Sequence, residues 1–133
     1  MDAREFLPIA KRYKSSTVEA ERRTSAGRSY YALFNAILTT LSRKGVIFRG
    51  APDEHHKLIA YLSNARSKTA SSVSEILKRL RRERNVADYH LMVIFKASRS
   101  EFMYEMAIDA PSQFDAIPAA EMAVIVRNIQ ALP

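Results

Sequence analysis

The sequence predicts an all-α protein, folded as an antiparallel bundle of four to five helices. Only three glycines and five prolines interrupt its 133 residues, so long stretches are free of helix-breaking residues. Within these stretches apolar residues recur at steps of three and four, which places them on one face of a helix. Short connections between such helices favour antiparallel neighbours. Because we find no internal repeat and no linker, we expect a single domain over residues 1–133.

Two helices are expected in the first third of the chain. Residues 2–13 form the first. A long second helix should begin at the capping-box pattern Ser16-Thr17-Val18-Glu19 and run to Lys44, because Gly45 suits the left-handed position that ends a helix. Its apolar stripe consists of Tyr30, Leu33, Phe34, Ile37, Leu38 and Leu41.

Two further helices are expected in the middle of the chain. Residues 45–52 are interpreted as a loop, after which Asp53 can cap a short helix. The apolar residues of that helix are Leu58, Ile59, Tyr61 and Leu62. A second capping-box pattern, Ser72-Val73-Ser74-Glu75, should open a helix that continues through at least Ala87.

The last third is less regular. Residues 91–95 and 102–108 are apolar, with a polar stretch between them, so either a short hairpin or an extra helix accounts for residues 91–108. We favour a helix over 100–108 capped by Ser98, and leave a strand over 91–95 open. Pro111 should break the chain, and a final helix over 119–132 should hold Pro118 in its first turn.

Composition excludes several classes of protein. The chain has no cysteine, which excludes disulfide frameworks, thiolate zinc sites and cysteine nucleophiles. No apolar run approaches the roughly 18 residues of a membrane span, and the first residues do not resemble a signal peptide. We therefore expect a cytoplasmic protein without a membrane partner. The sequence also lacks a convincing metal-binding cluster, so no metal or other cofactor is expected.

The net charge of +7 is unevenly distributed. Residues 1–99 hold 20 basic and 9 acidic residues, whereas residues 100–133 hold one arginine against five acids. Arginine outnumbers lysine 14 to 7, and the planar guanidinium group matches phosphate oxygens well. A basic body of this kind indicates a polyanionic partner.

Arg84 does not fit the face of its predicted helix. On a helical wheel it lies in the middle of the apolar stripe, whereas Arg82 projects away from that stripe and Arg81 flanks it. The stripe consists of Val73, Ile76, Leu77, Leu80 and Ala87. A buried arginine needs a partner, so Arg84 should either reach an anionic ligand, extend its head to solvent, or pair with a carboxylate. The candidate carboxylates are Glu19, Glu21 and Asp88.

His90 follows Arg84 by six residues and is a candidate general acid or base, because histidine titrates near neutral pH. On an unbroken helix these two residues lie about 120° apart. They could therefore converge only if the helix loosens after Ala87, or if two subunits each contribute part of a site. The adjacent pair His55 and His56 is interpreted as one packed and one exposed histidine at a helix entry.

Three segments together resemble the HEPN domain family. They are Gly27-Arg28-Ser29-Tyr30-Tyr31-Ala32-Leu33-Phe34-Asn35-Ala36, Glu54-His55-His56-Lys57-Leu58 and Arg84-Asn85-Val86-Ala87-Asp88-Tyr89-His90. The resemblance covers residues 3–90 and the last helix, and it implies a HEPN-type helical bundle that is often dimeric. Many members are metal-independent ribonucleases marked by an arginine, a polar residue and a histidine, a pattern that Arg84, Asn85 and His90 match.

The resemblance implies a ribonuclease toxin that attacks phosphate with the ribose 2′-hydroxyl of its RNA substrate. Arg84 and His90 would be catalytic, and Asn85, Arg81 and Arg82 would bind RNA. The implied partners are a second copy of the chain and a nucleotidyltransferase-like antitoxin. Two alternatives remain: a non-catalytic HEPN adaptor that binds a nucleotide or partner protein, and a purely structural helical subunit with a solvated basic face.

Overall fold

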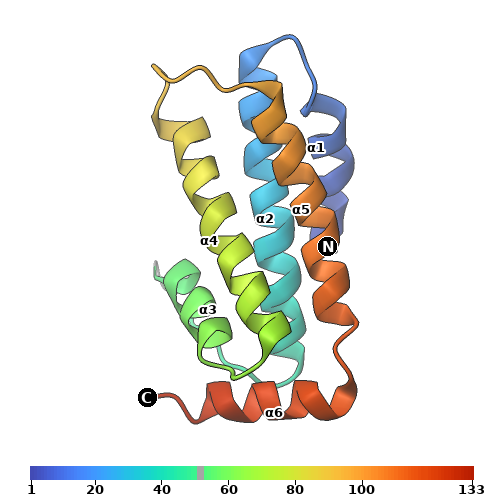
Figure 1. Cartoon of the computed structure of the whole chain (residues 1–133), viewed down its shortest axis with the longest axis vertical. Helices are drawn as coiled ribbons and strands as arrows, with labels where there is room; N and C mark the ends of the chain where they lie inside the picture. Colours follow the sequence, from blue (N-terminus) through green and yellow to red (C-terminus); the bar gives the residue numbers. More distant parts are fainter. Residues whose placement is uncertain (51–52) are drawn as a thin grey trace.

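The computed structural model describes residues 1–50 and 53–133, and all regular structure in these ranges is helical (Figure 1). A short 3₁₀ turn, η1 (Ala3–Phe6), leads into α1 (Leu7–Tyr13). The other helices are α2 (Glu19–Arg43), α3 (Glu54–Ser63), α4 (Lys68–Tyr89), α5 (Ala97–Asp115) and α6 (Ala119–Gln130). The all-α prediction is confirmed. The strand considered for residues 91–95 is wrong, because this segment is an irregular link between α4 and α5.

The bundle is centred on α2. This helix packs against α1, α4 and α5, and α4 also packs against α3 and α5. Figure 1 shows α4 running against α2 and α5, with α6 lying across one end of the bundle. The largest fully buried side chains come from these packed helices and from the α4–α5 link: Tyr30, Leu33, Ile37, Leu41, Leu58, Leu62, Leu77, Leu80, Phe95, Met103, Phe114 and Ile125. No helix in the described ranges is long and apolar enough to cross a membrane.

The first capping box is wrong, because tertiary contacts use its residues differently. Glu19 is the first residue of α2, and Ser16 accepts a hydrogen bond from the amide of Val18 at 3.0 Å. The Glu19 carboxylate instead accepts a hydrogen bond from the amide of Phe95 at 2.9 Å. The predicted end of α2 is confirmed: Gly45 follows it with a φ of +96°, which favours glycine.

The second capping box is also wrong. The N-cap of α4 is Ser67, whose hydroxyl accepts a hydrogen bond from the amide of Ala70 at 3.2 Å, so Ser72 and Glu75 lie inside the helix. Ser74 is buried and donates to the carbonyl of Ile59 on α3 at 3.0 Å. This serine therefore joins α3 to α4 and does not cap a helix. Asp53 likewise precedes α3 without a side-chain capping bond.

The extra helix is longer than expected. It begins at Ala97 and runs through Pro111, so the predicted break at this proline is wrong and Ser98 lies inside the first turn. Proline removes one backbone hydrogen bond, but Pro111 is buried together with Ala110 and Phe114, and this packing holds the helix. Pro118 is the N-cap of α6, one position before its first turn.

Candidate RNA-binding surface and the position of Arg84 and His90

Arg84 is buried, as its position on the apolar stripe predicts. Its guanidinium carbon lies 5.5 Å and 5.4 Å from the ring centroids of Tyr30 and Tyr31 on α2. One of its terminal nitrogens lies 3.4 Å from the carboxylate of Asp88, so one of the carboxylate pairings considered from the sequence is present. Its Nε atom is buried without a hydrogen-bond partner in the described part of the chain. The guanidinium group therefore retains hydrogen-bonding capacity.

His90 is exposed and lies apart from Arg84 within one chain. It is the C-cap of α4, and its amide still donates to the carbonyl of Val86 at 3.0 Å. Because α4 continues through Tyr89, the convergence of Arg84 and His90 through a loosened helix end is wrong. Six residues of regular helix separate their Cα atoms by about 9 Å along the axis, with about 120° of rotation. A shared site would therefore need two chains.

The three predicted RNA-binding residues lie together on one surface. Arg81, Arg82 and Asn85 line an open groove of about 460 Å³ with His56, Ile59 and Lys78. A terminal nitrogen of Arg81 lies 3.3 Å from both ring nitrogens of His56, which places α3 beside α4 here. The Nε atom of Arg81 is buried and unpaired within the described ranges. Within the described ranges no acidic side chain lines this groove, although Lys78 also pairs with Glu75 at 3.1 Å.

His56 and Lys78 are groove residues that we did not predict as ligands. The sequence alone could not show that His56 lies beside α4, because His56 belongs to α3. On the helical wheel Lys78 projects away from the apolar stripe, as Arg82 does. A signal existed for it, since Lys78, Arg81, Arg82 and Asn85 recur at steps of three and four on one helix.

His55 is half-buried while His56 is exposed, so the expected difference between the two histidines is confirmed. The Nδ1 atom of His55 lies 2.5 Å from the hydroxyl of Tyr30, and its ring stacks on Phe34 at 4.2 Å. Burial raises the pKa of Tyr30 to about 12, so this hydroxyl is protonated and donates to Nδ1. Burial, together with the charges of Arg81 and Arg84, lowers the pKa of His55. A neutral imidazole is therefore part of the packing between α2 and α3.

Replacing His55 by phenylalanine is expected to weaken the pH dependence of stability between about pH 7.5 and about pH 5.5. Because the folded pKa lies below the ordinary value of 6.5, the unfolded chain takes up the proton first as the pH falls. Stability from neutral His55 is thus complete above pH 6.5 and is lost as the pH falls through the folded pKa. Urea denaturation at both pH values would measure this effect. His56→Phe is the control, and an unchanged slope in His55→Phe would contradict the prediction.

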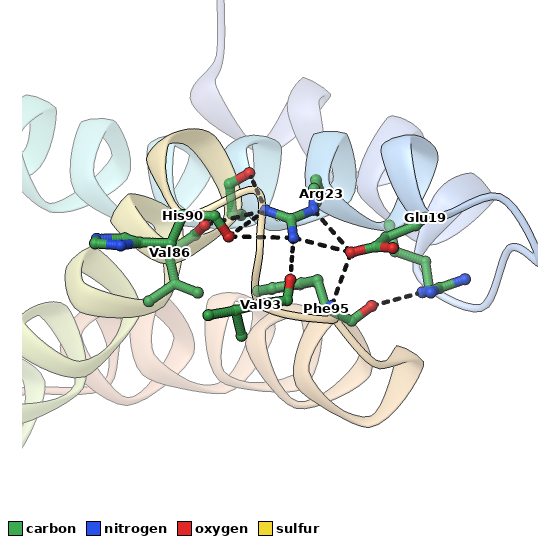
Figure 2. A network of polar contacts seen from close by, with 8 residues as sticks. Glu19, Arg23, Val86, His90, Val93 and Phe95 are labelled. Carbon is green, nitrogen blue, oxygen red and sulfur yellow. Dashed lines mark hydrogen bonds and ion pairs between the residues drawn. The ribbon is translucent and has the colours of Figure 1, made fainter.

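Arg23 is the residue that sequence reasoning missed. It is 8% exposed, and it donates to the carbonyls of Val86 at 3.1 Å, Ala87 at 2.9 Å and His90 at 3.3 Å (Figure 2). It also donates to the carbonyl of Val93 and pairs with Glu19 at 2.9 Å. Carbonyls at a helix C-terminus lack partners within the helix, and Arg23 supplies them for α4.

A sequence signal for Arg23 existed. It lies seven residues before Tyr30, and therefore on nearly the same face of α2 as the apolar stripe. Hydrogen bonds from the Phe95 amide and from Arg23 lower the pKa of Glu19, so this carboxylate stays ionised beside the arginine. Together, Glu19 and Arg23 hold the backbone of His90 in place. Figure 2 shows the His90 imidazole directed away from this network.

Comparison of the chain with protein-family models, with curated proteins and with solved structures found no match. Among residues 1–50 and 53–133, no group of three or more His, Asp or Glu side chains is arranged so that it could hold a metal ion. The surface of α3 and α4 therefore offers cationic and amide donors. The exposed imidazole of His90 lies at the C-terminal end of α4, outside the lining of this groove.

Proposed function

We propose that the protein binds RNA through the α3–α4 groove and cleaves it as a homodimer. In this proposal Arg84 of one chain acts with His90 of the other. The observation that carries the proposal is the groove itself, whose lining in the described part of the chain includes Lys78, Arg81 and Arg82 but no acidic side chain. The proposal that the bound RNA is also cleaved rests on the resemblance to the HEPN family.

A phosphodiester backbone matches the chemistry of this groove. Guanidinium groups present N–H donors in a planar array that fits phosphate oxygens. Arg82 is exposed and available to a second phosphate, and Lys78 is exposed but would have to exchange its 3.1 Å pairing with Glu75 for a phosphate. The side-chain amide of Asn85 could orient a ribose or base. Because most of these contacts are with charge, we expect affinity to fall steeply with added salt.

The proposed cleavage is an internal transfer at phosphorus. The 2′-oxygen of a ribose attacks the adjacent phosphate as its proton passes to a base, and the bond from phosphorus to the 5′-oxygen breaks. The 5′-oxygen takes up a proton, which leaves a cyclic phosphate and a 5′-hydroxyl end. His90 would serve as the base or acid, and Arg84 would stabilise the charge that develops on the phosphate oxygens. The phosphate would displace Asp88, whose 3.4 Å contact with Arg84 is long.

A non-catalytic adaptor is the second candidate. The observation that favours it is the burial of Arg84 between α2 and Asp88, apart from His90 of the same chain. An adaptor would bind RNA, a nucleotide or a partner protein without turnover, and Arg84→Ala would weaken that binding. The resemblance also motivates a nucleotidyltransferase-like antitoxin as a partner of either form.

Incubation of the purified chain with RNA in EDTA tests the proposed activity. We expect wild-type protein to produce fragments that end in cyclic phosphate. Saturable binding without fragments would support the adaptor. Equally weak binding to RNA and DNA, lost at moderate salt, would indicate the structural subunit with a solvated basic face.

The double variant Lys78→Gln/Arg82→Gln is expected to weaken RNA binding and to lower the salt dependence of log Kd by about 1.4, which corresponds to two lost contacts on single-stranded RNA. Both side chains are exposed, so the fold should be unaffected. Fluorescence anisotropy with labelled RNA at several salt concentrations would measure both quantities.

The matched control for charge is Lys11→Gln/Arg12→Gln. It removes one lysine and one arginine from the exposed face of α1, on the other side of α2 from the groove (Figure 1). We expect it to change affinity much less. Equal losses in the two double variants would show that only the total charge matters and that the groove is not the binding site.

A further inference from the structure

The link between α4 and α5 exposes an unusual run of apolar side chains. The exposed fractions are 72% for Tyr89, 72% for Leu91, 98% for Met92, 46% for Val93 and 70% for Ile94. Single exposed apolar residues are common, but a contiguous patch of this kind marks an interaction surface. We call residues 89–94 the apolar tip.

Several hydrogen bonds hold the apolar tip in shape. Arg23 binds the carbonyls of His90 and Val93, and Glu19 accepts from the amide of Phe95 (Figure 2). Arg22 donates to the carbonyl of Phe95 at 2.9 Å, and the Phe95 side chain is fully buried. A backbone anchored at both ends in this way presents the tip in one conformation. Such preorganisation lowers the entropic cost of binding.

The distribution of charge favours a second copy of the chain as the binding partner of the tip. The protein carries a net charge of +7, so two copies repel each other over most of their surfaces. Residues 89–95 contain no lysine, arginine, aspartate or glutamate, and a contact between two tips therefore avoids this repulsion.

The area of the tip is close to what a dimer needs. At about 150 to 250 Å² for a large side chain, the exposed fractions correspond to roughly 600 Å². A standard interface buries about 800 Å² on each partner. Val18, which is 51% exposed, lies on the loop whose Ser16 carbonyl is bound by Arg22, next to Phe95. This residue extends the apolar surface toward the required size.

We propose that two copies of the chain associate through their apolar tips, with Arg23 as the residue that shapes the interface. The contact is isologous, so Leu91 and Met92 of one copy pack on the tip of the other. The interface contains His90, and its catalytic meaning rests on the proposed function. Together with the proposed function, this interface would bring His90 of one copy toward Arg84 of the other.

Sedimentation velocity at micromolar concentrations tests the proposal. We expect wild-type protein to be dimeric and Leu91→Asp/Met92→Asp to be monomeric, since two charged tips would repel each other. The matched control is Ile47→Asp, because Ile47 is also 70% exposed but lies outside the tip. It should remain dimeric. Circular dichroism should show equal helix content in all three proteins, as the substituted residues are exposed.

The outcomes separate this proposal from the proposed function. A monomeric wild-type protein, or a double variant that remains dimeric, overturns the tip interface whether or not RNA is cleaved. A dimer that depends on the tip but does not cleave RNA in EDTA supports the interface and rejects the nuclease. A monomer that sediments with phosphatidylserine vesicles only when its tip is intact assigns the tip to a membrane and also overturns the proposal.

Discussion

His90→Ala is expected to lower the rate of RNA cleavage by roughly 10² to 10⁴-fold, the usual contribution of a general acid or base. RNA affinity should change little, because His90 does not line the α3–α4 groove. Stability should also change little, since the imidazole is exposed and the capping bonds of this residue come from its backbone. Initial rates in EDTA, anisotropy with labelled RNA and thermal unfolding would measure the three effects. Equal cleavage by His90→Ala and wild-type protein would reject the catalytic assignment.

Mixing two inactive variants tests whether the site spans two chains. A dimer of one Arg84→Ala chain and one His90→Ala chain contains one site with both residues intact. If subunits exchange freely, half of the dimers are mixed and about a quarter of wild-type activity should return. If activity fails to return although exchange is shown by fluorescence transfer between labelled chains, Arg84 and His90 do not act across the dimer.

Arg23→Met is expected to lower the free energy of unfolding by about 3 kcal/mol, because several backbone carbonyls lose a charged donor and such hydrogen bonds contribute about 1.5 to 3 kcal/mol each. Methionine fills much of the volume but donates no hydrogen bond, so Arg23's carbonyl contacts at the end of α4 are lost. For a domain of this size the melting temperature should fall by roughly 10 °C or more. Urea denaturation followed by circular dichroism would measure the change.

Two variants control for the loss of charge. Arg12→Met removes the same side chain from an exposed position on α1 and should cost less than about 0.5 kcal/mol. Arg23→Lys keeps the positive charge but lacks the planar array of donors, so it should recover only part of the stability. A loss below about 1 kcal/mol in Arg23→Met would show that the network does not stabilise the α4–α5 link.

The local rules of helix formation made much of the fold predictable. Steps of three and four between apolar residues identified the helices of the bundle and placed Arg84 among buried side chains, as the structure shows. Capping patterns were less reliable. Ser16 and Ser72 both begin a capping-box pattern, yet neither caps its helix, because Glu19 accepts from the amide of Phe95 and α4 already begins at Lys68.

The sequence by itself determined the all-α class, the buried face of α4 and the basic character of residues 1–99, because these properties depend on residue type and short-range spacing. Only the tertiary structure decided that His56 joins Arg81, that Arg23 closes α4, and that the uncharged segment 89–95 is held at the surface. Each of these contacts links helices or loops that are distant along the chain. Helical periodicity orients a side chain about its own axis, but it carries no information on which neighbour that side chain meets.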